Sequence, residues 1–175
     1  MSSARYSKRI YGVNSTICRR IEPFETTAVA ALAREVFDQF VAPLYHPDGV
    51  SEFHRYTLAD ALSQRHESDH VTLVAEHSGE LAGILHLRKP CHVAMLFVRS
   101  SFQHKGIGRK LLAAAAALVG DPDCEFTVNS SPNAVFAYEH LGFHAIGAEQ
   151  CVHGIRFIPM RKQRQNGRRG IRHDA

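Results

Sequence analysis

The stretch 98–112, VRSSFQHKGIGRKLL, constrains the fold more than any other part of the chain. An apolar run at 92–98 ends there in a polar turn, and an alanine- and leucine-rich segment with helical spacing follows. This pattern predicts a central strand, buried on both faces, that passes through a short loop into a helix with Gly106 and Gly108 at its start. Because the first N–H groups of a helix have no partners within it and carry partial positive charge, the junction favours binding of an anion.

The residues around the two glycines strengthen this prediction. Neither glycine has a side chain to keep an anion away from the N–H groups, and Lys105, Arg109 and Lys110 add positive charge within one turn. Two other phosphate-binding patterns fit less well. A dinucleotide fingerprint requires a third glycine where Leu111 stands, and the G-x-x-x-x-G-K-[ST] sequence of a Walker loop is absent. The alternative is that the glycines only ease a tight strand-to-helix turn.

Hydrophobic periodicity predicts the other elements. We expect strands at 16–21, on both sides of the turn at 78–79, and at 92–98, 124–128, 143–146 and 152–160. We expect helices at 23–40, after a cap at Ser51, at 106–119 and at 133–141, with a proline-containing loop at 42–49. This order predicts one α/β domain with a mixed sheet at 15–160, between a loose arm at 1–14 and a basic tail at 161–175.

Two motifs give the chain a family resemblance. The spacing Q-x-x-G-x-G formed by Gln103, Gly106 and Gly108 resembles motif A of the GNAT superfamily of N-acetyltransferases. The segment 129–143, NSSPNAVFAYEHLGF, looks like motif B, in which an asparagine opens a helix and a tyrosine precedes an x-x-L-G-F ending. With the hairpin and the first two helices, the resemblance covers roughly residues 15–160. One departure is Ser100, where the family usually has proline, and it affects the rigidity of the turn rather than the chemistry.

The resemblance implies a GNAT fold, with a central mixed, mostly antiparallel sheet flanked by helices, and acetyl-coenzyme A as cosubstrate without a metal. It implies that the backbone of Leu96, Phe97 and Val98 binds the pantetheine arm and the thioester carbonyl. Asn133 would contact the pantetheine, and Tyr138 would lie beside the sulfur. The pyrophosphate would bind main-chain N–H groups of one loop, formed by Gln103, His104, Lys105, Gly106, Ile107, Gly108, Arg109 and Lys110.

Acyl transfer to an amine agrees with the residue types. The reaction passes through a tetrahedral oxyanion, which fixed N–H donors stabilise. The leaving thiolate needs a proton, and a tyrosine with an ordinary pKa of about 10 is still a donor at neutral pH. Tyr138 is therefore the candidate catalytic acid, unless it is only a half-buried packing residue. The base that deprotonates the amine stays open among Glu52, His92 and a chain of waters.

The acceptor amine is not specified by the sequence. The loop at 42–49 and the second helix are expected to border its site, where Tyr45, Asp48 and Glu52 would attract a cationic amine. The acceptor can be a small-molecule amine or a peptide amine. Whether the protein forms a homodimer also stays open.

Net charge and hydropathy exclude several other classes of function. Lys and Arg number 21 against 17 acids, but the residues from Arg161 onward hold six of the bases and one acid, so the domain itself is nearly neutral. A nucleic-acid partner is therefore not favoured, and the tail reads as a solvated extension or a contact for an acidic partner. No apolar run approaches the ~20 residues of a membrane span, and no hydrophobic stretch follows the basic start, so we expect neither a membrane partner nor a secretory signal.

The four cysteines, Cys18, Cys91, Cys124 and Cys151, lie 27 or more positions apart and form no C-x-x-C pair. This spacing predicts four free thiols and a cytoplasmic location. The segment 66–70, HESDH, matches the zinc pattern H-E-x-x-H. Because His70 runs directly into a strand, we expect His66 and His70 not to share a helix, and we interpret the match as chance.

The sequence thus predicts an acetyl-coenzyme A-dependent N-acetyltransferase that transfers the acetyl group directly to an amine in a ternary complex. The competing hypothesis is a non-catalytic acyl-coenzyme A sensor. A sensor would keep Gln103, Gly106 and Gly108 but need neither Tyr138 nor an open acceptor cleft, so the tyrosine favours the enzyme.

Overall fold

The computed structural model describes residues 15–162, so the predicted arm and most of the predicted tail lie outside the described residues. The strands are β1 (Thr16–Arg20), β2 (His70–His77), β3 (Glu80–Arg88), β4 (His92–Val98), β5 (Thr127–Ser130), β6 (Phe143–Ala145), β7 (Gln150–Val152) and β8 (Ile155–Lys162). The α-helices are α1 (Thr26–Phe40), α2 (Pro47–Tyr56), α3 (Ala59–His66), α4 (Ile107–Val119) and α5 (Val135–His140). Short 3-10 helices are η1 (Pro23–Glu25), η2 (Ala42–Leu44), η3 (Ser100–Phe102) and η4 (Pro132–Ala134). Strand β8 reaches Lys162, so the domain extends past its predicted end at 160.

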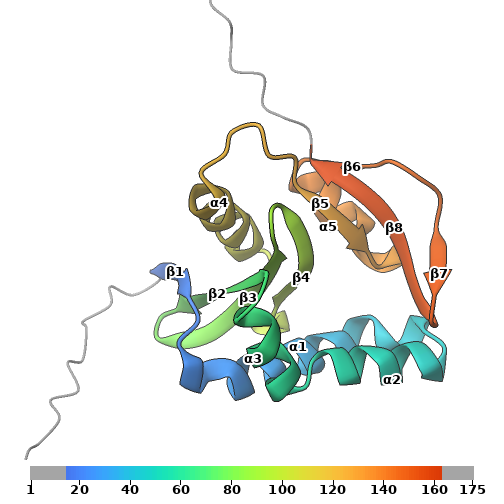
Figure 1. Cartoon of the computed structure of the whole chain (residues 1–175), viewed down its shortest axis with the longest axis horizontal. Coiled ribbons are helices and arrows are strands. Elements are labelled where there is room, and N and C mark those ends of the chain that lie inside the picture. Colours follow the sequence, from blue (N-terminus) through green and yellow to red (C-terminus); the bar gives the residue numbers. More distant parts are fainter. Residues whose placement is uncertain (1–14, 163–175) are drawn as a thin grey trace, which may run out of the picture.

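The strands form one sheet in the order β1-β2-β3-β4-β5-β8-β6, with β7 paired to β8. Strands β4 and β5 are parallel, and the other neighbouring pairs are antiparallel. Helix α4 lies on one side of strands β2–β4, and α1 and α3 lie on the other (Figure 1). This arrangement confirms the predicted mixed, mostly antiparallel sheet flanked by helices.

Alternating side chains of the central strands build a core on each face of the sheet. On one face, Leu85 and Val93 pack with Leu111 of α4. On the other face, Ile84 and Met95 pack with side chains of α1, among them Val29, Leu32, Ala33 and Val36. The two cores hold β3 and β4 rigidly between the helices, and this fixes where β4 ends.

Strand β4 is paired very differently along its two edges. It pairs with β3 from His92 to Val98, with Ala94 as an extra residue at a bulge. It pairs with β5 only at His92 and Val93, so beyond Val93 the two strands separate and leave a gap. The prediction that β4 is buried on both faces is therefore wrong at its end, because Leu96, Phe97 and Val98 are each only half-buried.

The predicted loop at 42–49 and the single helix after it are also corrected. Helix α2 begins at Pro47, which suits the first turn of a helix, and Ser51 lies inside it rather than at its cap. Buried Thr57 ends α2 by donating its hydroxyl to the Phe53 carbonyl at 2.9 Å, and α3 starts after Leu58 as a separate helix. Apolar spacing alone does not reveal this break.

The C-terminal strands differ from their predicted bounds. The strand predicted at 124–128 is β5, displaced to Thr127–Ser130. The run predicted as one strand at 152–160 contains a turn at His153-Gly154, where both residues have positive φ, and this turn separates β7 from β8. The turn allows β7 to fold back on β8 as a hairpin.

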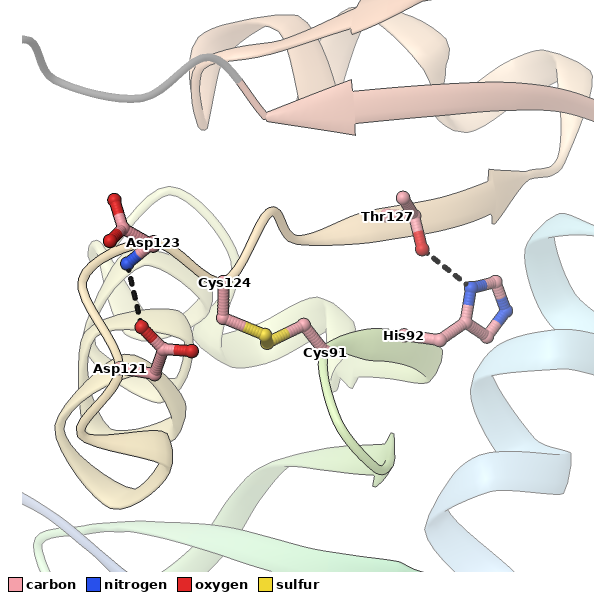
Figure 2. The surroundings of a disulfide bond; sticks show 6 residues. All are labelled: Cys91, His92, Asp121, Asp123, Cys124 and Thr127. Atoms are coloured by element: carbon pink, nitrogen blue, oxygen red, sulfur yellow. Dashed lines mark hydrogen bonds between the residues drawn. A yellow bond between two sulfur atoms is a disulfide. The ribbon is translucent and has the colours of Figure 1, made fainter.

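A disulfide joins Cys91 to Cys124, with Cα atoms 6.3 Å apart (Figure 2). The prediction of four free thiols is therefore wrong for this pair, and only Cys18 and Cys151 are free among residues 15–162. The two cysteines meet because Cys91 immediately precedes β4, and Cys124 lies three residues before the neighbouring parallel strand β5. The predicted cytoplasmic location rested on free thiols and loses that support.

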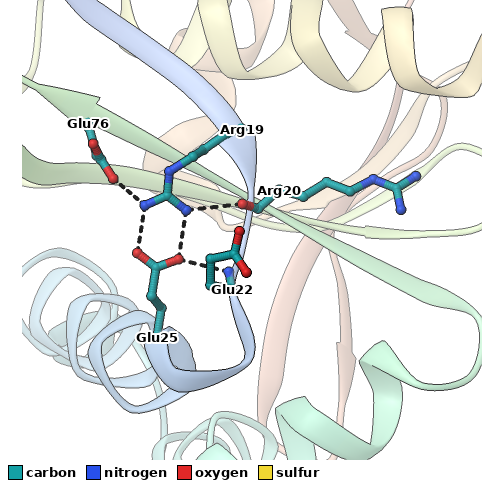
Figure 3. Close-up of polar contacts among 5 residues, drawn as sticks. All are labelled: Arg19, Arg20, Glu22, Glu25 and Glu76. Atoms are coloured by element: carbon teal, nitrogen blue, oxygen red, sulfur yellow. Dashed lines mark hydrogen bonds and ion pairs between the residues drawn. The ribbon is translucent and has the colours of Figure 1, made fainter. Parts of the chain in front are cut away.

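An ion-pair cluster holds the edge strand β1 on the sheet (Figure 3). The Arg19 guanidinium donates to both carboxylate oxygens of Glu25, each at 2.7 Å, and also contacts Glu76 of β2. Its hydrogen bonds lower the pKa of the Glu25 carboxyl below its ordinary value. The cluster therefore fixes η1, and with it the start of α1, against β2.

We predict that Cys91→Ala/Cys124→Ala lowers the free energy of unfolding by about 3–4 kcal/mol, because the disulfide closes a long loop in the unfolded chain. Chemical denaturation of the oxidised protein measures the loss. Cys18→Ala/Cys151→Ala is the matched control and should leave the stability sensitive to reductant. Alkylation of all four cysteines in unreduced, denatured protein would contradict the disulfide.

Candidate active site

The loop between β4 and α4 is held by its own residues. The Gln103 side chain donates from Nε2 to the carbonyl of Val98 at 3.1 Å, which ties the loop to the end of β4. His104 (φ 61°) and Gly106 (φ 74°) both have left-handed backbone, so the chain turns sharply into α4. The first helical hydrogen bond runs from the Lys110 N–H to the Gly106 carbonyl, so the N–H groups of Ile107, Gly108 and Arg109 precede it and have no helical acceptor.

Glycine occurs at positions 106 and 108 for different structural reasons. Gly106 is required by its positive φ. Gly108 has no such backbone requirement, and a Cβ built on it would meet nothing closer than Leu96 Cδ2 at 4.0 Å. Easing the turn therefore explains Gly106 but not Gly108. Open space at the start of a helix is what an anion needs to reach the free N–H groups.

Positive charge surrounds this space. Lys105 and Lys110 are exposed, and within residues 15–162 no carboxylate forms an ion pair with either of them. The Lys105 ammonium lies 4.9 Å from the Phe102 ring centre, and the Arg109 side chain donates to the His140 carbonyl at 2.9 Å. A helix N-terminus with two lysines that form no ion pair within residues 15–162 is typical of a site that binds an anion.

The edge of β4 that faces β5 is unpaired just before the chain enters that loop. Past Val93, the backbone edge of β4 that faces β5 has no strand partner, and this stretch includes Leu96, Phe97 and Val98. Unpaired N–H and C=O groups of a strand can bind an extended chain that carries amides. The predicted loop follows directly from this stretch of β4, and Gln103 ties it to the Val98 carbonyl.

Tyr138 lies on α5 and is buried, with 8% of its surface exposed. Its ring packs edge-on against Phe143 with centres 5.4 Å apart, and its hydroxyl forms no hydrogen bond within residues 15–162. Burial raises the pKa of this phenol well above its ordinary value. Tyr138 is therefore protonated at neutral pH and has an unused proton to donate.

Asn133 has a role that the sequence did not reveal. Its Nδ2 donates to the carbonyl of Phe40 at 2.8 Å, so η4 is tied to the end of α1. The side chain is exposed, and its Oδ1 forms no hydrogen bond to residues 15–162.

Two predicted acceptor-site residues have protein partners. The hydroxyl of half-buried Tyr45 donates to the Arg156 carbonyl at 2.6 Å, and burial raises its pKa to about 12. Glu52 is paired with Arg55 on the same helix. Tyr45 thus fastens η2 to β8 and is not a free contact for a substrate.

The contact between α2 and the β7–β8 turn was missed by sequence reasoning. A Cβ on Gly49 would lie 2.1 Å from the carbonyl oxygen of Gly154, so the two backbones touch directly. Arg156 adds a hydrogen bond of 3.0 Å from Nη1 to the Leu44 carbonyl. A Gly-Val sequence within a helix gives no hint of a partner so far along the chain.

His92 lies where the gap begins. Its Nδ1 is 2.9 Å from the hydroxyl oxygen of Thr127, its partner on β5, and the two share a hydrogen bond (Figure 2). Burial lowers the pKa of the imidazole, and the charge of Arg88 and of His70 lowers it further. His92 is therefore neutral at physiological pH, with Nε2 free of any hydrogen bond to residues 15–162.

The H-E-x-x-H match does not form a single helical face. His66 ends α3 and His70 opens β2, which confirms that the two imidazoles do not share a helix. Within residues 15–162, no three His, Cys, Asp or Glu side chains are grouped to hold a metal ion.

None of the helices in that range is long and apolar enough to cross a membrane.

A hollow lies on the other side of the sheet, among the residues after β1 and the elements α1, α3 and β2. It is lined by Ile21, Pro23, Thr26, Val29, Leu62, Ser63, His66, Glu67 and Thr72. Its surface is mostly apolar and contains no lysine or arginine. It therefore does not suit a diphosphate, and the β4–α4 junction is the better site.

Comparison with known protein families identifies the family to which this chain belongs. A family model described as an acetyltransferase (GNAT) domain matches residues 41–164. The chain belongs to the GNAT acetyltransferase family. The GNAT fold predicted from the two motifs is thus confirmed. No curated protein sequence matches the chain.

Solved GNAT structures share the fold. A GCN5-related N-acetyltransferase from Rhodopseudomonas palustris superimposes with a TM-score of 0.70 at 23% identity, covering 87% of this chain and 98% of that one. The PaiA N-acetyltransferase from Thermoplasma acidophilum, in complex with coenzyme A, gives 0.67 at 23% identity, covering 85% and 99%. The aminoglycoside acetyltransferase AAC(6')-Ib, also with coenzyme A, gives 0.58 at 19% identity, covering 86% and 96%.

We predict that Gly108→Glu weakens coenzyme A binding at least tenfold, or about 1.4 kcal/mol, because a carboxylate and its bulk enter the space of the pyrophosphate. Titration calorimetry measures the affinity. Gly108→Ala is the matched control and should lose less, since its Cβ is accommodated 4.0 Å from Leu96. Unchanged affinity in a folded Gly108→Glu protein would mean that the pyrophosphate binds elsewhere.

Proposed function

We propose that this GNAT protein is an N-acetyltransferase that moves an acetyl group from acetyl-coenzyme A to a primary amine by direct transfer in a ternary complex. The observation that carries the proposal is the unpaired edge of β4 at the gap between β4 and β5, just before the chain enters the loop and the open helix start at Gly108. The family match supports acetyl transfer, and structural neighbours include a spermidine N-acetyltransferase chimera and an aminoglycoside acetyltransferase. The acceptor here is a small-molecule or peptide amine.

The coenzyme is bound mainly by main-chain groups in this proposal. The loop from Gln103 to Lys110 holds the pyrophosphate through the N–H groups of His104, Lys105, Gly106, Ile107, Gly108 and Arg109, because the N–H groups of Gln103 and Lys110 already donate to the carbonyls of Ser100 and Gly106. Leu96, Phe97 and Val98 bind the pantetheine amides and the thioester carbonyl through the unpaired β4 edge, and Asn133 adds its Oδ1. Donors fixed at the thioester carbonyl also stabilise the oxyanion that forms there during transfer.

Tyr138 acts as the general acid. Its hydroxyl has no protein acceptor and keeps its proton because burial raises its pKa. Collapse of the tetrahedral intermediate breaks the C–S bond, Tyr138 protonates the departing thiolate, and the phenolate then regains its proton from water. Tyr138 packs in the same core as Val93, on the α4 side of the sheet, so the thiol leaves on that side.

His92 acts as the general base. It neighbours Val93 in β4, and successive side chains of a strand point to opposite faces, so His92 faces the side of the sheet opposite to the Tyr138 core. A neutral imidazole with a free Nε2 can accept the proton of the amine, while Thr127 fixes the orientation of the ring. Glu52 is the weaker candidate because Arg55 already neutralises it.

We predict that Tyr138→Phe reduces turnover by about 10²–10⁴-fold, while coenzyme affinity and thermal stability stay close to wild type. The hydroxyl forms no hydrogen bond to the described protein, so its removal breaks no contact. Thiol release from acetyl-coenzyme A across a panel of primary amines is the assay, and it also tests the function itself. A loss of only two- or threefold would demote Tyr138 to a packing residue.

We predict that turnover of the wild type falls as the pH drops through a His92 pKa that lies below its ordinary 6.5. The sign follows from the chemistry, because the neutral imidazole is the active form and protonation removes the base. His92→Gln keeps a polar partner for Thr127 but should lose the acid limb and about 10²–10⁴-fold of the rate. Glu52→Gln distinguishes the two candidate bases. If the fall in turnover at low pH disappears in that variant, the general base is Glu52 and not His92.

A further inference from the structure

Helix α5, which carries Tyr138, is only six residues long. A helix of this length is not stable by itself, so its position depends on contacts from outside it. Its start is held through η4 by the Asn133 bond to Phe40. Its end, where the last carbonyls have no helical partner, is held by two cationic side chains.

The first cation is Arg109, whose Nη2 donates to the His140 carbonyl at 2.9 Å. The second is Lys162 of β8, whose ammonium donates to the Leu141 carbonyl. Gly142, with φ 90°, closes the helix by a bond of 2.9 Å from its N–H to the Glu139 carbonyl. Positive groups at a helix C-terminus are favourable both as donors and through the helix dipole.

Arg109 therefore connects two elements, α4 through its main chain and α5 through its side chain. Its main chain is in the first turn of α4, next to Gly108, where the free N–H groups lie. Its side chain reaches across to the end of α5. It is the direct polar contact that the structure gives between the first turn of α4 and the helix of Tyr138, within residues 15–162.

We propose that Arg109 is a positioning residue that couples occupancy of the α4 helix start to the placement of the Tyr138 hydroxyl. This rests on the proposed function for its effect on turnover, but not for the coupling itself. An anion bound at the N–H groups of Ile107 and Gly108 fixes the first turn of α4. Through its bond to the His140 carbonyl, the Arg109 side chain then holds the end of α5, two residues from Tyr138.

The kinetic test is Arg109→Met, which keeps the aliphatic stem and removes the guanidinium. Turnover should fall about tenfold through misplacement of Tyr138, while the Kd for coenzyme A stays within about twofold. Arg109→Lys should recover part of the turnover, because an ammonium can still donate to one carbonyl. Arg20→Met, which removes an exposed guanidinium of β1, is the matched control and should change neither quantity. Coenzyme affinity lowered tenfold with unchanged turnover would overturn the proposal and make Arg109 a phosphate ligand.

The second test needs no catalytic activity. Hydrogen exchange of the amides of Leu141 and Gly142, which bond back into α5, reports how firmly this helix end is held. Coenzyme A should slow exchange at the start of α4 and at the end of α5 in the wild type, but only at the start of α4 in Arg109→Met. Equal slowing at α5 in both proteins would overturn the coupling. If the protein acetylates no amine but wild type and Arg109→Met still differ in hydrogen exchange at the end of α5, the proposed function is contradicted and the coupling stands.

Discussion

The short parallel pairing between β4 and β5 is the constraint on which the rest of the site depends. The strands share only the pairs His92–Thr127 and Val93–Val128 before they separate. Each strand is then held by a different neighbour, β4 by β3 and β5 by β8, so the gap cannot close by sliding one strand against the other. A sheet with complete pairing here would offer no free backbone to a ligand.

Three further connections frame the gap. The Cys91–Cys124 disulfide lies just before the paired residues, at the closed end. Asn133 connects η4 with α1, and the direct contact of Gly49 with Gly154 connects α2 with the β7–β8 turn. Bonds of different kinds thus hold the two halves of the sheet at a fixed separation. A preformed site of this type loses little conformational freedom when it binds a long, flexible ligand.

The local part of the site was predictable from sequence, because it depends on neighbouring residues. The helix predicted at 106–119 is α4 within one residue, and its glycines and cations lie where the spacing placed them. The disulfide was not predictable, since Cys91 and Cys124 approach each other only when β4 and β5 lie side by side. The same reason hid the Tyr45 bond to Arg156 and the Arg109 bond to His140, which join elements distant in the chain. The gap itself escaped because an apolar strand has the same sequence pattern whether a second strand or a ligand covers its edge.

The most direct measurement is a crystal structure of the protein with coenzyme A. The account predicts the pyrophosphate within hydrogen-bond distance of the N–H groups of Ile107 and Gly108, the pantetheine along Leu96–Val98, and the sulfur beside the Tyr138 hydroxyl. A pyrophosphate bound in the hollow among β1, α1 and α3 would contradict it. So would a sulfur that lies outside the gap between β4 and β5.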